Sequence, residues 1–97
     1  MDAAYVYLLR CADGSLYCGW TVDVPKRLDA HATGKASRYT STRRPITLAA
    51  AWELPTRTDA RKFEARVKQL TRREKLRLVA GAPLDGATPV RFAPPRS

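Results

Sequence analysis

The fold is decided by two short stretches near the N-terminus: Tyr5-Val6-Tyr7-Leu8-Leu9-Arg10-Cys11 and Ser15-Leu16-Tyr17-Cys18-Gly19-Trp20-Thr21. Both are rich in the aromatic and aliphatic residues that favour β-strands. The three residues between them, 12–14, read Ala-Asp-Gly, which is a turn signal. The sequence therefore predicts a β-hairpin.

The turn allows two registers for this hairpin. A two-residue turn would pair Tyr7 with Trp20 and would place Tyr7 and Tyr17 on opposite sides of the sheet. A three-residue loop, with Gly14 left-handed in a bulge, would pair Tyr7 with Gly19 and would place both tyrosines on one face. An Asp-Gly turn is compatible with both loops, so the residues leave the register open.

Helices and one further strand are predicted after the hairpin. Asp23 is expected to cap a helix from Val24 to about Thr33, with Gly34 just after its end. Residues 34–45 are polar and basic and are predicted to form a loop. Residues 46–54, which lie between two prolines, are predicted to form a third strand.

Two more helices complete the predicted domain. Thr58 or Asp59 is expected to start one of them, and the apolar residues of its buried face recur at helical spacing. Thr71 and Glu74 form a capping box that starts the other, and Gly81 ends it. We therefore expect an α/β (α+β) unit of order ββαβα(α) over residues 1–81, with a three-stranded mixed sheet flanked by helices. The Pro/Gly-rich tail, residues 82–97, is expected to be an extended arm or partly disordered.

The composition describes one basic domain. Of its 97 residues, 18 are Lys or Arg, most of them Arg, and nine are Asp or Glu, which gives a net charge of +9. A guanidinium binds phosphate through two parallel hydrogen bonds, so this balance points first to nucleic acid and second to an anionic membrane surface. No apolar run approaches the ~18 residues of a membrane span, and the N-terminus does not resemble a secretory signal.

The cysteines indicate a reducing compartment. Two cysteines and one histidine are too few for a structural zinc site with four ligands. Cys11 and Cys18 are not directly opposite each other in either hairpin register, which argues against a disulfide. Because free thiols fit the cytoplasm, we expect that location.

An ordered set of residues runs along these elements: Tyr5-Val6-Tyr7, Tyr17-Cys18-Gly19, Arg27, His31 and Glu64. In this order and spacing the set resembles the GIY-YIG nuclease domain, named for the tripeptides on its first two strands. The chain is most similar to the small single-domain bacterial members. These share its residues 21–28, its His31 with Gly34-Lys35 and Arg38-Tyr39-Thr40, and its run 67–71. The resemblance spans about residues 4–80.

The resemblance implies a metal-dependent endonuclease that hydrolyses DNA phosphodiesters. Glu64 would hold one Mg²⁺ (or Mn²⁺), which binds with few protein carboxylates because it keeps several waters. Of Tyr7 and Tyr17, one would take the proton from water and the other would orient the phosphate. Arg27 would bind the scissile phosphate, and His31 would share it or carry a proton.

Each of these residues also has a structural interpretation. Glu64 is four residues before Lys68, which is the spacing of a surface ion pair on a helix. Tyr7 and Tyr17 are also ordinary strand residues, and His31 suits the last turn of a helix because of the helix dipole.

The basic residues beyond this set are candidates for tracking the substrate backbone, although a solvated charged face is the alternative for each one. The nucleic-acid-binding candidates are Lys35, Arg38, Tyr39, Arg43, Arg44, Arg61, Lys62, Arg72 and Arg73. With no second domain to read sequence, we expect selection by nucleic-acid structure or by a partner protein. A DNA repair or recombination role is the family-level expectation.

Two features of the sequence depart from the family pattern. Only the second tripeptide keeps its glycine, and Cys18 stands where isoleucine is usual. Many larger members use an asparagine late in the domain, and this chain contains none. The alternative function is therefore a catalytically weak or inactive module of the same fold that binds DNA or RNA.

Overall fold

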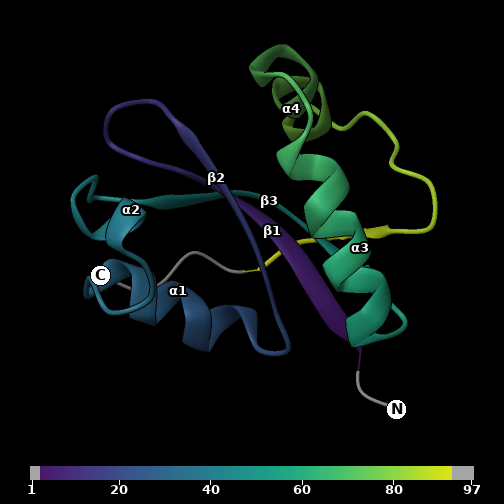
Figure 1. The fold of residues 1–97 in the computed structure, drawn as a ribbon, viewed down its shortest axis with the longest axis horizontal. Helices are drawn as coiled ribbons and strands as arrows, with labels where there is room; N and C mark the ends of the chain where they lie inside the picture. The colour runs from purple at the N-terminus through teal and green to yellow at the C-terminus, as the bar shows by residue number, and fades with distance from the viewer. Residues whose placement is uncertain (1–2, 93–97) are drawn as a thin grey trace.

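The computed structural model describes residues 3–92, which form one antiparallel sheet with helices on both faces (Figure 1). The elements are β1 (Ala4–Arg10), β2 (Leu16–Thr21), α1 (Val24–Ala32), α2 (Arg38–Ser41), β3 (Thr47–Leu54), α3 (Arg57–Lys68), α4 (Arg72–Val79) and β4 (Thr88–Val90). The strand order across the sheet is β2-β1-β3-β4. No helix in this part of the chain has the length and apolar character needed to cross a membrane.

The hairpin has the register of the three-residue loop. Tyr7 pairs with Gly19 and Leu9 pairs with Tyr17, so both tyrosines lie on the same face of the sheet. Gly14 has φ of +84°, in the left-handed region, and its N–H donates to the Cys11 carbonyl at 2.9 Å. A glycine adopts this conformation without steric cost, which makes it the residue that closes the loop.

The two faces of the sheet carry separate cores. On one face, Tyr7, Leu9 and Ala51 are buried against residues that include Leu28 of α1. On the other face, α3 and α4 supply Ala60, Phe63, Val67 and Leu78, which pack on the opposite side of β1 and β3. The alternation of side chains along β1 therefore divides the molecule into an α1 face and an α3 face.

The prediction of a three-stranded mixed sheet was wrong in strand number and in direction. All pairings are antiparallel, because α1 and α2 carry the chain from the end of β2 past β1 to the start of β3. A helical connection usually joins parallel neighbours. Here β2 and β3 do run parallel, but β1 lies between them.

The fourth strand lies in the predicted tail. Residues 88–90 pair with β3, with Val90 opposite Ala51, so the chain after residue 81 continues the sheet. The prediction of an extended or partly disordered arm covered residues 82–97, of which 93–97 lie outside the described residues. The domain boundary at residue 81 stays a prediction.

Smaller differences concern the loop and the helix starts. The predicted loop 34–45 contains the short helix α2, which Ser37 caps by accepting from the Tyr39 N–H. α3 begins at Arg57 rather than at residue 58 or 59, because the Thr56 hydroxyl caps it by accepting from the Asp59 N–H. The capping box of Thr71 and Glu74 is confirmed at the start of α4. Cys11 and Cys18 are free and buried.

Candidate active site

A cavity of about 280 Å³ opens at the β2 edge of the sheet. Because β2 is an outer strand, α1 on one face and α3 on the other both reach this edge. The cavity is lined by Tyr7, Tyr17, Gly19, Trp20, Thr21, Val22, Arg27, Arg57 and Glu64. The structure therefore brings together four of the five predicted catalytic residues, one each from β1, β2, α1 and α3.

Gly19 is what lets Tyr7 reach the cavity from the inner strand. A Cβ at residue 19 would lie 2.6 Å from Cζ of Tyr7, which is closer than any real carbon contact. The Tyr7 ring thus passes over the backbone of Gly19 towards the edge. The glycine of the Tyr17-Cys18-Gly19 tripeptide therefore has a steric reason within this chain.

The fifth predicted residue, His31, lies behind Tyr7 in a buried chain of hydrogen bonds. Tyr7 Oη is 2.9 Å from Nε2 of His31, and Nδ1 of His31 is 2.8 Å from Oγ1 of Thr40. The Thr40 hydroxyl donates to the Ser37 carbonyl at 3.4 Å. All three side chains are buried, so each polar atom depends on these partners.

Two tautomers of His31 satisfy this chain of bonds, since each ring nitrogen donates or accepts according to which one carries the proton. In the tautomer that we assign, the Thr40 proton goes to the Ser37 carbonyl and Thr40 Oγ1 accepts from Nδ1–H of His31. Nε2 is then the unprotonated nitrogen, and it accepts from the Tyr7 hydroxyl. The proton of Tyr7 therefore points away from the cavity, and its oxygen lone pairs are left for the cavity side.

Burial and one cation set the charge states of this pair. Burial raises the pKa of Tyr7, and the nearby positive charge of Arg27 partly opposes that rise. Burial also lowers the pKa of His31, and there Arg27 acts in the same direction as burial. Tyr7 and His31 are thus both neutral near pH 7, with His31 as the available proton acceptor.

Tyr17 forms the outer wall of the site together with Tyr39 of α2 and Arg43, which follows that helix. Its ring meets the edge of the His31 ring at a centroid distance of 5.3 Å and stacks on Tyr39 at 5.8 Å. The guanidinium of Arg43 lies 3.8 Å above the Tyr39 ring, and its Nε donates to Asp13 at 3.0 Å. Tyr17 is therefore held by aromatic neighbours, and its hydroxyl has no partner among the hydrogen bonds of residues 3–92.

Glu64 is the acidic residue of the cavity. It lies on α3, and 22% of its side chain is exposed. Oε1 of Glu64 is 3.6 Å from Nζ of Lys68, so the predicted ion pair between these two residues is present as well. Cys18 lies in the same region: burial, with the Glu64 charge as the next cause, raises its pKa to about 12, so its thiol stays protonated.

A family model described as the GIY-YIG catalytic domain matches residues 3–77. The chain belongs to the GIY-YIG family. It is 45% identical over 86 residues to the UPF0213 protein BH0048 of Halalkalibacterium halodurans, covering 87% of this chain and 92% of that one. It is 42% identical over 79 residues to a UPF0213 protein of Staphylococcus aureus, covering 81% and 96% of the two chains.

A solved structure agrees with the fold. The solution NMR structure of the UPF0213 protein BH0048 from Bacillus halodurans matches with a TM-score of 0.53 over 87% of this chain and 86% of that chain, at 45% identity. The predicted resemblance to small single-domain members is confirmed. Membership of the GIY-YIG family supports a nuclease-type activity, while the names of these relatives state no activity.

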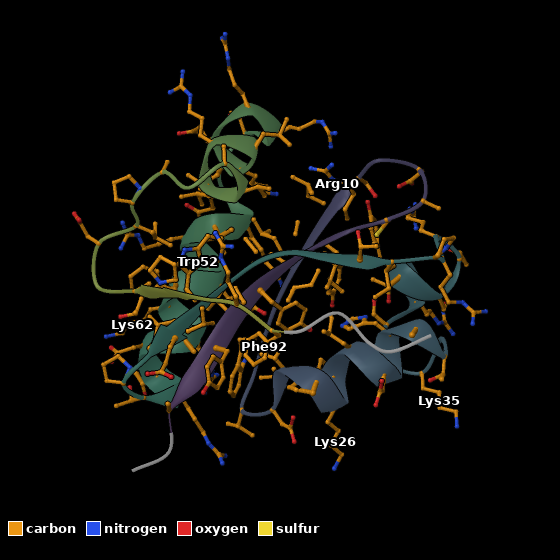
Figure 2. All side chains as sticks on the ribbon, turned by 180° about the vertical axis from the view of Figure 1, so that it is seen from behind. Arg10, Lys26, Lys35, Trp52, Lys62 and Phe92 are labelled. Carbon is orange, nitrogen blue, oxygen red and sulfur yellow. The ribbon has the colours of Figure 1, made fainter. Side chains whose placement is uncertain are left out.

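The predicted nucleic-acid-binding residues fall into two groups. Arg43, Arg44 and Arg72 make structural bonds: Arg43 to Asp13, Arg44 to the carbonyls of residues 32 and 41, and Arg72 to the carbonyl of residue 14. The other candidates are Lys35, Arg38, Tyr39, Arg61, Lys62 and Arg73, and all six are exposed. Lys35 and Lys62 project on opposite sides of the molecule (Figure 2), so the exposed cations do not form a single patch.

Sequence reasoning missed three residues of the site. Arg57 lines the cavity opposite Arg27, Trp20 lines it from β2, and Thr40 holds His31. Arg57 is the first residue of α3, seven positions before Glu64, so a correct N-cap would have placed both on one side of that helix. Thr40 belongs to a stretch that carries the family resemblance, but no role was predicted for it, because the helix that holds it against His31 was predicted as a loop.

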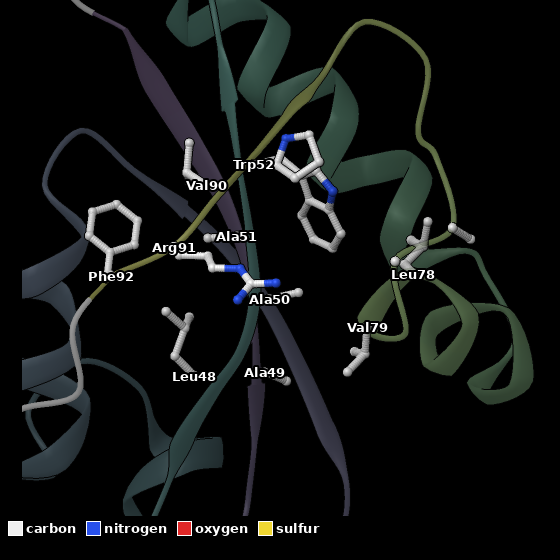
Figure 3. A pocket seen from close by; sticks show the side chains of 13 residues that line it. Leu48, Ala49, Ala50, Ala51, Trp52, Leu78, Val79, Val90, Arg91 and Phe92 are labelled. Carbon is white, nitrogen blue, oxygen red and sulfur yellow. The ribbon is translucent and has the colours of Figure 1, made fainter.

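The opposite edge of the sheet carries an apolar cavity of about 340 Å³ between β3, β4 and α4 (Figure 3). Trp52, Leu78 and Phe92 are among the residues that line it, and Arg91 is its one charged lining residue. The described residues that line it include no acid, base or nucleophile, so the candidate active site is the cavity at the β2 edge.

Proposed function

We propose that this protein is a metal-dependent endonuclease that hydrolyses DNA phosphodiester bonds. The observation that carries the proposal is the single cavity that Tyr7, Tyr17, Arg27 and Glu64 line together. It combines a proton-handling group, a cation for phosphate and a carboxylate for a metal, which are the parts that phosphodiester hydrolysis needs. Membership of the GIY-YIG family supports the nuclease class.

Glu64 would hold one Mg²⁺ or Mn²⁺ ion. Residues 3–92 contain no group of three His, Cys, Asp or Glu side chains placed to hold a metal. Among the described residues that line the cavity, Glu64 is the one carboxylate. That fits Mg²⁺, which keeps several waters and takes one or two carboxylates together with substrate phosphate. The bound ion would neutralise charge on the phosphate and stabilise the leaving oxygen.

Tyr7 and His31 would handle the proton of the attacking water. Tyr7 gives its proton to Nε2 of His31 along the 2.9 Å hydrogen bond as its oxygen accepts a proton from water. Burial raises the pKa of Tyr7 and so disfavours its ionised form. Because Tyr7 gains a proton from water as it gives one to His31, it does not have to ionise. Thr40 keeps the acceptor nitrogen of His31 facing Tyr7 throughout.

Arg27 and Tyr17 would position the scissile phosphate. Arg27 is exposed on α1, and residues 3–92 place no carboxylate within 4.0 Å of its guanidinium. Its charge is therefore available for the phosphate oxygens, where negative charge grows in the transition state. The free hydroxyl of Tyr17 would donate to the same group from the α1 face.

The substrate choice and the setting are also part of the proposal. The lining groups suit the sugar-phosphate backbone, which carries no sequence information. We therefore infer selection by nucleic-acid structure, with a role in DNA repair or recombination, alone or with a partner protein. The free, buried Cys11 and Cys18 support a place in the cytoplasm.

The test is cleavage of labelled single-stranded, duplex, flapped and branched DNA, with one RNA, in Mg²⁺, Mn²⁺ or EDTA at low salt. Wild type is compared with Tyr17→Phe and Glu64→Gln. We expect cleavage that requires the metal and that both variants lose while they keep binding. Binding without cleavage in wild type would instead favour the inactive DNA- or RNA-binding module, and cleavage that survives Glu64→Gln would exclude Glu64 as the ligand.

A further inference from the structure

A second cavity, of about 490 Å³, adjoins the candidate site on the α3 face. It is lined by Trp20, Thr58, Arg61, Lys62, Glu64 and Ala65. Trp20 and Glu64 line both cavities, so the two share a wall. Sites for small molecules are commonly about 300–1,000 Å³, so this space is large enough for a further part of the substrate.

The second cavity combines one aromatic surface with two free cations. Trp20 is half-buried on β2 opposite Val6, and it packs against the α3-face core, which holds its indole in place. Arg61 and Lys62 are consecutive and exposed on α3. No carboxylate lies within 4.0 Å of either cation in the described part of the chain. Stacking surfaces beside unpaired cations are the usual means of holding a nucleotide strand.

The charge of Glu64 orients whatever enters this cavity. In the metal-free chain its carboxylate at the shared wall repels a phosphate, whereas Arg61 and Lys62 attract one. The uncharged base of a nucleotide is therefore favoured against Trp20, and its phosphate is favoured at the two cations. Such a nucleotide would be covalently continuous with a phosphate in the neighbouring cavity.

We propose that this second cavity is a subsite for the nucleotide next to the scissile phosphate of a DNA strand. The base stacks on Trp20, and the phosphate binds Arg61 and Lys62. The strand then crosses the sheet edge from Arg27 on α1, past Glu64, to α3. The inference rests on the proposed function, since that places the scissile phosphate in the first cavity.

The experiment measures binding of an eight-nucleotide single-stranded oligodeoxynucleotide to the full chain in EDTA, followed by tryptophan fluorescence. Stacking should quench Trp20, while Trp52, buried in the core, gives a constant background. Trp20→Leu should abolish the quench and weaken binding about 5- to 150-fold, which corresponds to the usual value of one stacked base. Because Trp20 also packs in the core, thermal unfolding checks that this variant is folded.

A pair of double variants tests the phosphate contacts without touching the core. Arg61→Gln/Lys62→Gln should reduce the slope of log affinity against log salt by about 0.7, because the two cations bind one phosphate and each phosphate contact to a single strand contributes about that much. Arg77→Gln/Arg91→Gln removes the same charge from exposed residues that line neither cavity, and it should keep the wild-type slope.

The outcomes separate the subsite from the nuclease. If wild type cleaves DNA but the two double variants have equal affinity and slope, the subsite is refuted and the proposed function stands. If the quench and the slope change occur but no substrate is cleaved with metal, the subsite is supported as a binding site and the nuclease is refuted. Tighter binding of the matching oligoribonucleotide would overturn the assignment to DNA.

Discussion

Replacing Thr40 by valine tests the hydrogen-bond chain that we assign to proton transfer. Valine keeps the shape of threonine but removes the hydroxyl that accepts from Nδ1–H of His31 at 2.8 Å. Nδ1 would then have no partner, whichever ring nitrogen carries the proton, at a site where Thr40 and His31 are 0% and 1% exposed. An unsatisfied buried donor or acceptor costs about 1–3 kcal/mol of the free energy of unfolding.

The same change should affect catalysis by a separate route. Without Thr40 to hold its proton on Nδ1, neutral His31 can place the proton on Nε2, which faces Tyr7. Tyr7 then loses its acceptor, and general base catalysis of this kind contributes about 10²- to 10⁴-fold to rate. We expect a loss of cleavage within that range, with DNA binding unchanged.

The matched control for this variant is Thr40→Ser. Serine keeps the hydroxyl and loses one buried methyl, at a cost of about 0.8 kcal/mol. Urea unfolding compares the stabilities, single-turnover cleavage compares the rates, and the ¹⁵N shifts of the imidazole report the tautomer. If the valine variant matches the serine variant in both stability and rate, Thr40 does not set the state of His31 and the proton path is wrong.

Three further predictions follow from the geometry of the site. Because burial lowers the pKa of His31, the unfolded chain binds a proton at a higher pH than the folded chain does. The free energy of unfolding should therefore fall as the pH drops below about 6.5. Urea unfolding from pH 7.5 to 5 measures this dependence, and His31→Gln should remove it. Lys68→Gln should lower the Mg²⁺ concentration for half-maximal cleavage by up to about 5-fold. The Lys68 ammonium lies 3.6 Å from the Glu64 carboxylate, and its attraction at that distance in water is worth roughly 1 kcal/mol. An unchanged metal requirement would contradict a role for Glu64 as the metal ligand. Gly19→Ala should destabilise the fold by about 1–3 kcal/mol through overpacking against Tyr7, and Tyr7→Phe, which leaves the ring in place, should not rescue its melting temperature.

The sequence identified four candidate residues that the structure brings together, but it did not determine the hairpin register or the elements that surround them. Tyr7, Tyr17, Arg27 and Glu64 could be found because an ordered set of residue types carries the family resemblance, and the structure gathers them in one cavity. The hairpin register could be narrowed to two alternatives but not chosen, since an Asp-Gly turn fits both. Only the contact between Tyr7 and Gly19, which is non-local, separates them.

The errors share one physical cause, which is that the missed elements depend on tertiary partners. β4 is three residues long and contains a proline, so its local signal is weak; it forms because β3 offers it an edge. α2 is a single turn of four residues, too short to be stable alone, and the buried bond from Thr40 to His31 ties it to α1. Neither element could be predicted from local periodicity.

The position of the site at a sheet edge divides its work between the two faces. The groups to which we assign proton transfer, Tyr7 with His31 and Thr40 behind it, lie on the α1 face and are buried. Glu64 lies on the α3 face, beside cations and closer to water. A metal ion placed among the buried groups would shift their pKa values through its positive charge. Because residues from both faces line the cavity at the β2 edge, one phosphate there would contact both sets while each keeps the environment that its proposed chemistry needs.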